Sequence, residues 1–428
     1  MREMEDFLHF LNHSPSRYHA VANLCGELEA AGYTRLSEGE TRSLAPGGKY
    51  FVTRGGSSLL AFRIPRAYFT GFMISASHSD SPTFRVKENA ELNGPEGYVR
   101  LNTERYGGML CAPWLDRPLT VAGRALVKCG DAIEARLVYV DRDLLMIPNL
   151  AIHMNRKANE GFAYDPKCDM VPLMGMNLEK GAFRAIVART AGCKPEDVLG
   201  TDLYLCQRQK AVVWGAEDQF ISAQGLDDLQ CAWGCFRGFL AAEDSASVPL
   251  YVLMDNEEIG SGTKQGAGGT FLIDWIERIC AGVGRERLSA VANSFLVSAD
   301  NTHAVHPNHP EYADPTHRPA MNGGVVLKQG IRYTTDGVSQ AIFAALCEKA
   351  GVPVQRFANR SDLPGGGTLG LIATAHVSVH AVDIGLAQLA MHSCFETAGA
   401  QDTDHLIRAM TAFYSASFRE EDHRFTLN

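Results

Sequence analysis

The sequence predicts an α/β protein with a central mixed sheet, helices on both faces of that sheet, and a β-rich insertion. The chain has 428 residues, of which 46% are hydrophobic and 21% charged, and this length favours two domains over one compact core. Nearly continuous apolar runs alternate with segments of helical periodicity in both outer parts of the chain. Because such runs need cover on both sides, they indicate a sheet between two layers of helices.

The first 85 residues alternate between helix and strand signals. Apolar residues at positions 7–11 have helical spacing, and Ser14-Pro15-Ser16 then starts an alanine-rich helix that ends near Gly32. Two strand-like runs follow, at positions 58–64 and 69–76. We expect these elements to form the first part of the principal domain.

Residues 86–211 have a different character. Short segments such as 125–128 and 137–140 are separated by turn-rich polar pieces, which predicts a mostly β insertion. From residue 212 onward the alternation returns, with a helix at 227–242, a strand at 248–254, a helix near 273–279 and a strand at 295–298. The expected catalytic domain therefore consists of residues 1–85 and 212–428, and residues 86–211 form an inserted domain.

Composition argues against several classes of partner. Lys and Arg total 40 against 49 Asp and Glu, a net charge of -9, so the chain has no basic footprint for nucleic acid or an anionic membrane. No apolar run approaches the roughly 20 residues that span a bilayer, and the acidic N-terminal segment is unlike a signal peptide. The 11 cysteines are scattered, which indicates reduced thiols and a cytoplasmic protein.

Titratable side chains follow the apolar runs directly. Four runs, which end near residues 76, 254, 299 and 382, lead into acidic or histidine residues, and another carboxylate stands at the start of the helix at 227–242. The working crevice of an open α/β sheet lies beyond the carboxyl ends of its strands, so these groups are expected to meet at one edge. The residues concerned are His78, Asp80, Asp227, Glu257, Glu258, Asp300 and His392.

This set of side chains indicates a metal site. Crowded carboxylates would repel one another and take up protons unless a cation neutralised them. Histidine with Asp or Glu suits zinc, with manganese or cobalt as near substitutes. The two histidines with only three of these carboxylates already exceed the ligands that one catalytic zinc takes, but they suffice for two ions that share a bridging carboxylate.

The motifs around these residues resemble those of the aspartyl aminopeptidase family, in order and over essentially the whole chain. They are SHSDSP at 77–82, LDDL at 226–229, DNEEIGS at 255–261, SAD at 298–300, HAVHP at 303–307 and QLAMHS at 388–393. The resemblance implies a zinc-exopeptidase-like fold and a metal-dependent aminopeptidase that removes N-terminal Asp or Glu from peptides. It also implies two Zn²⁺ per subunit, with Mn²⁺ or Co²⁺ as substitutes, and a homododecamer of dimers that form through the inserted domain.

Roles for the metal ligands are carried over from the resemblance. His78, Asp227 and Asp300 would hold one ion. Asp227, Glu258 and His392 would hold the other, so that Asp227 is the bridge. The two ions would activate a water molecule for attack on the scissile carbonyl.

Two further carboxylates have expected catalytic roles. Glu257 would be the general base that takes the proton of the attacking water and passes it to the leaving amine. Asp80, two residues beyond His78, would be the carboxylate that fixes the tautomer of that imidazole.

An acidic first residue of the substrate needs a cation in the pocket, because an unpaired buried carboxylate costs several kcal/mol. Lys328 matches the family's substrate-binding lysine, and His303 and Tyr333 also fall on family substrate positions. His153 lies in the insertion, and the resemblance implies that it contacts substrate in a neighbouring subunit; a direct role as a metal ligand is the alternative.

Two other functions compete with this one. Another dinuclear aminopeptidase or amidohydrolase would share the metal set but have a different side-chain pocket. A catalytically inactive metal-binding scaffold is the third interpretation, and the acid at position 257 beside Glu258 argues against it. The glycine-rich segment at 365–370 matches G-x-G-x-x-G, but no strand precedes it and the expected downstream acid is missing, so a loop near substrate is favoured over a dinucleotide site.

Overall fold

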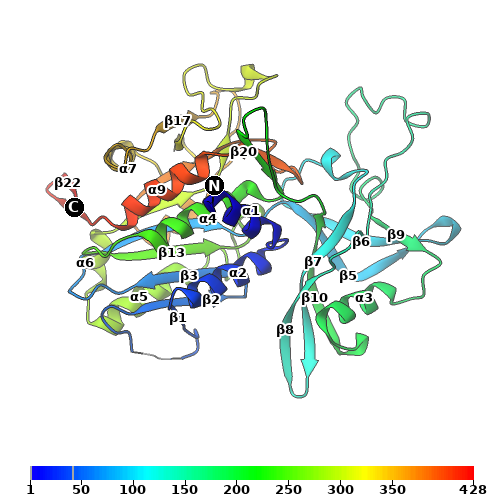
Figure 1. Ribbon diagram of the computed structural model, residues 1–428, viewed down its shortest axis with the longest axis horizontal. Coiled ribbons are helices and arrows are strands. Elements are labelled where there is room, and N and C mark those ends of the chain that lie inside the picture. Colours follow the sequence, from blue (N-terminus) through cyan, green and yellow to red (C-terminus); the bar gives the residue numbers. More distant parts are fainter. Residues whose placement is uncertain (1, 41–42) are drawn as a thin grey trace.

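The computed structural model describes residues 2–40 and 43–428 and contains a central nine-stranded sheet (Figure 1). In spatial order its strands are β1 (Thr34–Arg35), β2 (Lys49–Arg54), β3 (Ser58–Arg63), β13 (Val248–Met254), β4 (Phe72–His78), β14 (Phe295–Ala299), β18 (His380–Gly385), β16 (Val325–Gln329) and β17 (Val354–Ala358). The four strands β13, β4, β14 and β18 are mutually parallel, whereas β3 and β16 pair antiparallel with β13 and β18. The predicted mixed sheet is confirmed.

Helices cover both faces of this sheet. One face carries α1 (Arg2–Asn12), α2 (Arg17–Ala30), α4 (Leu226–Ala241), α7 (Gly337–Lys349) and α9 (Asp402–Tyr414). The other face carries α5 (Phe271–Val283), α6 (Arg287–Ala292) and α8 (Leu369–Thr374). In β13, Tyr251 and Leu253 pack into the first core while Leu250 and Val252 pack into the second. Burial on both faces explains why this strand reads as a continuous apolar run.

A separate antiparallel sheet of six strands lies beside the central one (Figure 1). Its strands, in spatial order, are β8 (Ala132–Tyr139), β7 (Leu119–Cys129), β10 (Val198–Gln207), β5 (Thr83–Asn93), β6 (Tyr98–Tyr106) and β9 (Leu173–Met176). Helix α3 (Ala182–Ala191) packs on it, and Trp114, Val121 and Phe183 belong to a hydrophobic core distinct from the two around the central sheet. The first of these strands in the sequence, β5, begins three residues before position 86.

Short strands form a third sheet that the sequence pattern did not predict. Its five strands, in spatial order, are β11 (Val212–Trp214), β12 (Phe220–Ala223), β20 (Glu396–Gly399), β19 (Ala387–Leu389) and β15 (Thr302–His303). The chain ends in a hairpin of β21 (Phe418–Glu421) and β22 (Arg424–Leu427). Because His392 follows β19, this third sheet delivers it to the edge of the central sheet.

The apolar run that ends near residue 382 starts and ends earlier than the strand it predicted. Helix α8 ends at Thr374, and β18 starts at His380 and continues through Asp383 to Gly385. The Asp383 carboxylate does not project from a strand end: it is buried and accepts hydrogen bonds from the Thr334 amide and the Thr368 hydroxyl. Strand β18 extends this far because its last residues pair with β16.

Two further features concern the described chain as a whole. Among the described residues, no helix combines the length and apolar character that crossing a membrane requires. All 11 cysteines are unpaired, and most of them are buried.

Candidate metal centre

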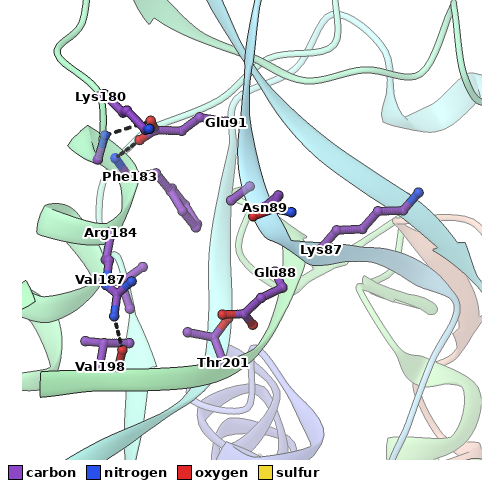
Figure 2. Close-up of a pocket in the computed structure, with 12 residues that line it drawn as sticks. Lys87, Glu88, Asn89, Glu91, Lys180, Phe183, Arg184, Val187, Val198 and Thr201 are labelled. Atoms are coloured by element: carbon purple, nitrogen blue, oxygen red, sulfur yellow. Dashed lines mark hydrogen bonds between the residues drawn. The ribbon is translucent and has the colours of Figure 1, made fainter. Parts of the chain in front are cut away.

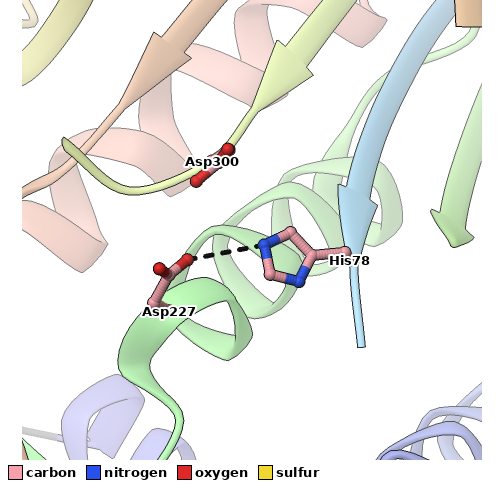
Figure 3. A group of neighbouring side chains, drawn as sticks. All are labelled: His78, Asp227 and Asp300. Carbon is pink, nitrogen blue, oxygen red and sulfur yellow. Dashed lines mark ion pairs between the residues drawn. The ribbon is translucent and has the colours of Figure 1, made fainter. Parts of the chain in front are cut away.

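Three side chains from distant parts of the chain meet at the carboxyl edge of the central sheet (Figure 3). His78 is the last residue of β4, Asp227 lies in the first turn of α4, and Asp300 directly follows β14. One ligand atom from each of these residues lies within 4.8 Å of the other two. The distance from His78 Nε2 to Asp227 Oδ1 is 3.4 Å.

A second group shares Asp227 with the first. One ligand atom from each of Asp227, Glu258 and His392 also lies within 4.8 Å of the others. Glu258 belongs to a single 3₁₀ turn, Glu257–Ile259, that follows β13. Asp227 Oδ2 lies 3.4 Å from His392 Nε2, so the two oxygens of Asp227 face different histidines. A third group, His78 with Glu257 and Glu258, overlaps both.

Both imidazoles are oriented by backbone carbonyls. His78 Nδ1 lies 3.0 Å from the carbonyl oxygen of Asp80, and His392 Nδ1 lies 2.7 Å from the carbonyl oxygen of Gly108. A carbonyl oxygen can only accept, so Nδ1 carries a proton in each ring, and in the neutral ring the free lone pair is on Nε2, which faces Asp227. This is the tautomer that a metal ligand needs.

The side chain of Asp80 makes contacts beyond the one with His78 that the sequence predicted. Its Oδ1 lies 3.6 Å from His78 Nδ1, farther than the Asp80 carbonyl. Its two oxygens accept hydrogen bonds from the backbone amides of Glu257 and Glu258, at 3.1 and 3.2 Å, and from the Tyr106 hydroxyl at 2.7 Å. The carboxylate of Asp80 therefore holds the turn that carries both glutamates.

The residues present fit a metal ion. Asp227 Oδ1 and Glu258 Oε1 are buried and have no hydrogen-bond partner among the described residues. Buried carboxylate oxygens without partners are costly, and a coordinated cation removes that cost. Imidazole nitrogens and carboxylate oxygens are also the donors that zinc takes in catalytic sites.

The electrostatics of the cluster agree with this fit. Burial, followed by the charges of Asp300 and Asp227, raises the pKa of Glu257 to about 7. Burial raises the pKa of Asp300 to about 6, against the opposing charge of Lys328. Burial and the charge of Asp227 also raise the pKa of Glu258 above its ordinary value. These carboxyl groups are too crowded to ionise together without a cation between them.

Lys328 lies directly beside the first group. It is 3% exposed, its Nζ donates to the Asn301 carbonyl at 2.7 Å, and it lies 3.6 Å from Asp300 Oδ1 and 5.7 Å from the centre of the Tyr333 ring. A Cβ added at Gly385 would lie 2.2 Å from the Asp300 carbonyl oxygen and 3.0 Å from Lys328 Cε. The lack of a side chain at Gly385 thus allows the end of β18 to approach the backbone of Asp300 and the side chain of Lys328.

The other expected substrate residues line the same region. The rings of His303 and Tyr333 both lie near Phe357, with centroid distances of 6.2 and 6.4 Å. A cavity of about 310 Å³ is lined by His303, Phe357 and Gln388, among others. His303 and Tyr333 therefore share Phe357 as a neighbour, and Tyr333 also lies beside Lys328.

His153 is the expected site residue that a single chain does not bring to the cluster. It lies on the long connection between β8 and β9, and its side chain is exposed. It belongs to none of the groups of described residues that could hold a metal ion. Within one chain, the structure gives no support for His153 as a ligand.

Two acidic residues of the site carried no recognisable signal in the sequence. The Glu396 carboxylate, in β20, accepts hydrogen bonds from the backbone amides of Asp227 at 3.0 Å and His392 at 2.7 Å. Asp228 Oδ2 accepts from the His78 amide at 3.1 Å. Asp228 stands in the LDDL motif, but the resemblance gave a role only to its neighbour Asp227. Glu396 could have been suspected only as an acid four residues beyond His392.

A further cavity, of about 240 Å³, lies in the inserted sheet between β5 and α3 (Figure 2). The Glu91 carboxylate on its wall accepts hydrogen bonds from the amides of Gly181 and Phe183, at 2.8 and 2.7 Å, where α3 begins. None of its described lining residues belongs to the histidine and carboxylate groups.

A mixed α/β sheet whose carboxyl edge gathers histidines and carboxylates that could hold metal ions is typical of metal-dependent hydrolases. Residues 10–414 match the family model described as "Aminopeptidase I zinc metalloprotease (M18)". The chain therefore belongs to the M18 family of metal-dependent aminopeptidases, and the predicted family is confirmed.

Individual relatives agree with this assignment. "Probable M18 family aminopeptidase 2" of Clostridium acetobutylicum is 40% identical over 419 residues, which cover 95% of this chain and 97% of that protein. The structure of the Ape4 and Nbr1 complex matches with a TM-score of 0.93 at 33% identity, over 96% of this chain and 85% of that chain. The S. cerevisiae mApe1 dodecamer matches with a TM-score of 0.85 at 28% identity, over 96% of each chain.

Proposed function

We propose that this protein is an aspartyl aminopeptidase that removes N-terminal Asp or Glu from peptides and uses two Zn²⁺ per subunit. The observation that carries the proposal is the buried ammonium of Lys328 beside Asp300, a member of the first metal-ligand group. A side chain that is 3% exposed at this edge of the sheet supplies a cation where the first residue of a substrate would lie.

In this proposal His78, Asp227 and Asp300 hold one ion, and Asp227, Glu258 and His392 hold the other. The two groups of ligand atoms within 4.8 Å and the unpartnered oxygens of Asp227 and Glu258 support the assignment. When bound, the two ions polarise the scissile carbonyl and acidify the attacking water. Mn²⁺ and Co²⁺ are expected to substitute, because they accept the same ligands.

Glu257 is proposed as the general base. It is adjacent in sequence to Glu258, and a ligand atom of each lies within 4.8 Å of His78, so the Glu257 carboxylate lies within reach of both ligand groups. From there it can take the proton of the attacking water and return it to the leaving amine. The Asp80 carboxylate keeps this turn in place by accepting hydrogen bonds from the amides of Glu257 and Glu258.

Specificity for an acidic residue is proposed to come from Lys328 with Tyr333 and His303. A buried substrate carboxylate without a cationic partner would cost several kcal/mol, and Lys328 removes that cost. One observation favours a different specificity in the same fold: Nζ of Lys328 already donates to the Asn301 carbonyl and lies 3.6 Å from Asp300. A dinuclear aminopeptidase or amidohydrolase with another side-chain preference is therefore the second candidate.

A panel of Asp, Glu, Leu and Lys aminoacyl fluorogenic substrates tests the specificity. We expect the highest kcat/KM for Asp or Glu. In Lys328→Met the ratio of Asp to Leu kcat/KM should fall by about 10- to 100-fold, the effect of one lost charge-assisted hydrogen bond. The ratio is used because loss of Lys328 also affects Asp300 and so metal binding. A change in metal binding lowers kcat/KM for both substrates of the same variant and therefore cancels in the ratio.

Lys349→Met, at an exposed position on α7, is the matched control and should leave the ratio unchanged. Faster cleavage of Leu or Lys substrates by the unaltered protein would show that the second candidate function is the right one.

We also propose that residues 86–211 form an inserted dimerisation domain and that dimers assemble into a homododecamer. Support comes from the separate core of the six-stranded sheet and from the dodecamer described for S. cerevisiae mApe1. Around His153, the apolar side chains of Leu150, Ile152 and Met154 are 57%, 49% and 70% exposed. Such a surface suits contact with a second copy of the chain. His153 would then contact substrate in the neighbouring subunit.

Complementation between two variants tests this arrangement. Glu257→Gln and His153→Ala proteins should each have low activity, whereas co-expressed mixtures should regain about a quarter of the unaltered activity. Half of randomly paired two-fold dimers are mixed, and each mixed dimer has one complete site of two. The control pairs Glu257→Gln with the Glu257→Gln/His153→Ala double variant and should show no recovery. Full activity of His153→Ala alone would contradict the proposal.

A cytoplasmic location is proposed as well. It is supported by the 11 unpaired cysteines, which include the neighbouring buried pair Cys231 and Cys235 on α4. Thiols in this number persist where the compartment is reducing.

A further inference from the structure

We infer that Tyr106 at the end of β6, the next two residues, and Arg17 position the turn that carries Glu257. The inserted sheet thereby forms part of the wall of the active site. The inference rests on the proposed role of Glu257 as general base. It assigns positioning roles to residues that lie outside the metal-binding motifs.

The hydroxyl of Tyr106 is the centre of the contacts. It donates to Asp80 Oδ2 at 2.7 Å and accepts from Arg17 Nη1 at 2.6 Å and from Asn256 Nδ2 at 2.8 Å. A phenol has one donor and two acceptor positions, so all of its hydrogen-bonding capacity is used. Tyr106 is buried, and no water is needed to complete this network.

These bonds bear on both ends of the turn at 255–258. At its far end, the Asp80 carboxylate that Tyr106 supports accepts the amides of Glu257 and Glu258. Near its start, the side chain of Asn256 donates to Tyr106, and the backbone of Asn256 has a φ of 63°. A non-glycine residue in this left-handed conformation requires neighbouring contacts that hold it.

Arg17, at the start of α2, connects the same turn to the N-terminal helices. Its Nη1 donates to Asp255 Oδ1 at 2.8 Å as well as to Tyr106. The guanidinium is stacked between two rings of the inserted sheet, 4.1 Å from the centre of Tyr106 and 4.3 Å from the centre of Tyr204. It is 4% exposed. A buried planar cation with an ionised partner and two aromatic faces has a single favourable placement.

The two residues after Tyr106 contact the second ligand group. Gly107 has a φ of +77°, and a Cβ there would lie 3.2 Å from Glu258 Cβ, so the backbone packs directly on that glutamate. The Gly108 carbonyl accepts from His392 Nδ1, and the Leu110 amide donates to the His392 carbonyl at 3.0 Å. One strand end of the inserted sheet therefore touches the turn and His392 together.

This arrangement makes the placement of Glu257 depend on how the inserted sheet docks. Loss of the Tyr106 hydroxyl would remove one donor from Asp80 and one acceptor each from Arg17 and Asn256, while the ring would keep the packing. Misplacement of a reacting group by about 1 Å costs on the order of 100-fold in rate. The expected effect is a change in kcat with little change in substrate binding.

Tyr106→Phe, compared with Tyr204→Phe, tests the inference on the full-length protein. Tyr204 is stacked on the other face of Arg17, is buried to the same degree, and makes no side-chain hydrogen bond to a described residue. We expect Tyr106→Phe to lower kcat by about 10- to 100-fold, with KM changed less than about 2-fold and zinc content unchanged. Tyr204→Phe should retain kcat within about 2-fold.

Arg17→Lys is the second variant. It keeps the positive charge but lacks the planar guanidinium group that donates to Tyr106 and Asp255. It should also lower kcat at unchanged zinc content, and its unfolding temperature is measured beside the others. An unchanged kcat in both variants, or a loss that follows zinc content in proportion, would overturn the inference. The Glu257→Gln variant distinguishes a failure of the proposed function from a failure of this inference. Full activity in that variant would rule out Glu257 as the base. An inactive Glu257→Gln together with a fully active Tyr106→Phe would rule out only the positioning role.

Discussion

Replacement of Glu257 by Gln is expected to lower kcat by about 1000-fold or more while both zinc ions stay bound. General base catalysis contributes about 100- to 10,000-fold, and an amide of the same shape cannot take up the proton. Glu257 belongs to neither of the two ligand groups that contain Asp227. Single-turnover rates and the zinc content of the purified variant are the measurements.

The control for this substitution is Glu243→Gln, at an exposed position beyond the end of α4, which should change neither quantity. Unchanged turnover in Glu257→Gln would rule out Glu257 as the base. A loss of turnover together with one zinc ion would instead make Glu257 a ligand, as the third group with His78 and Glu258 allows.

Asp227→Asn is expected to lose both metal ions, whereas Asp300→Asn is expected to lose one. The two oxygens of Asp227 each lie 3.4 Å from Nε2 of a different histidine, His78 or His392. Asparagine replaces one of these oxygens with an NH₂ group that has no lone pair to offer, and its remaining oxygen is uncharged, so neither ion keeps a carboxylate ligand from this position. Zinc content after dialysis should fall below one ion per subunit, and activity should fall to background.

Chelation of the unaltered protein provides the comparison. It should abolish activity, and Zn²⁺, Mn²⁺ or Co²⁺ should restore it, because the ligands themselves are intact. Asp227→Asn should not recover at the same metal concentration. Equal zinc losses in Asp227→Asn and Asp300→Asn would contradict a shared ligand, since only a bridge affects both ions.

The elements of the central sheet could be predicted from local pattern. The strand expected at 248–254 is β13 with the same limits, and the helix expected at 227–242 is α4 displaced by one residue. Both have strong signals, since β13 is apolar throughout and α4 follows a glycine and has two acids in its first turn. In the parallel part of the sheet, chain direction alone places the residues after β4, β13 and β14 at one edge.

The five-stranded sheet could not be predicted in the same way. Its strands have two to four residues, and β12 pairs with β20, where Phe220 lies opposite Gly399. Strands this short have too few residues for a periodic pattern, and their pairing depends on segments that are remote in the sequence. This sheet nevertheless places His392, and through Glu396 it holds the backbone of Asp227.

Lys328 is a further residue whose environment only the structure reveals. From the sequence it is a lysine near the end of an apolar run, and most such residues are solvated. In the structure it is buried in β16, because Asp300 and the Asn301 carbonyl from the neighbouring loop compensate its charge. Its burial depends on the close approach at Gly385, which only the packed strands reveal.

The sequence by itself determined the chemical identity of the site: histidines and carboxylates placed directly after buried strands, in motifs specific enough to indicate the family. Only the tertiary structure decided how these groups are held. It turned the Asp80 carboxylate toward the amides of Glu257 and Glu258, and it brought Tyr106 of the inserted sheet against them. The physical reason is that a ligand's identity is a local property of the chain, whereas its hydrogen-bond partners come from whichever distant segments pack beside it.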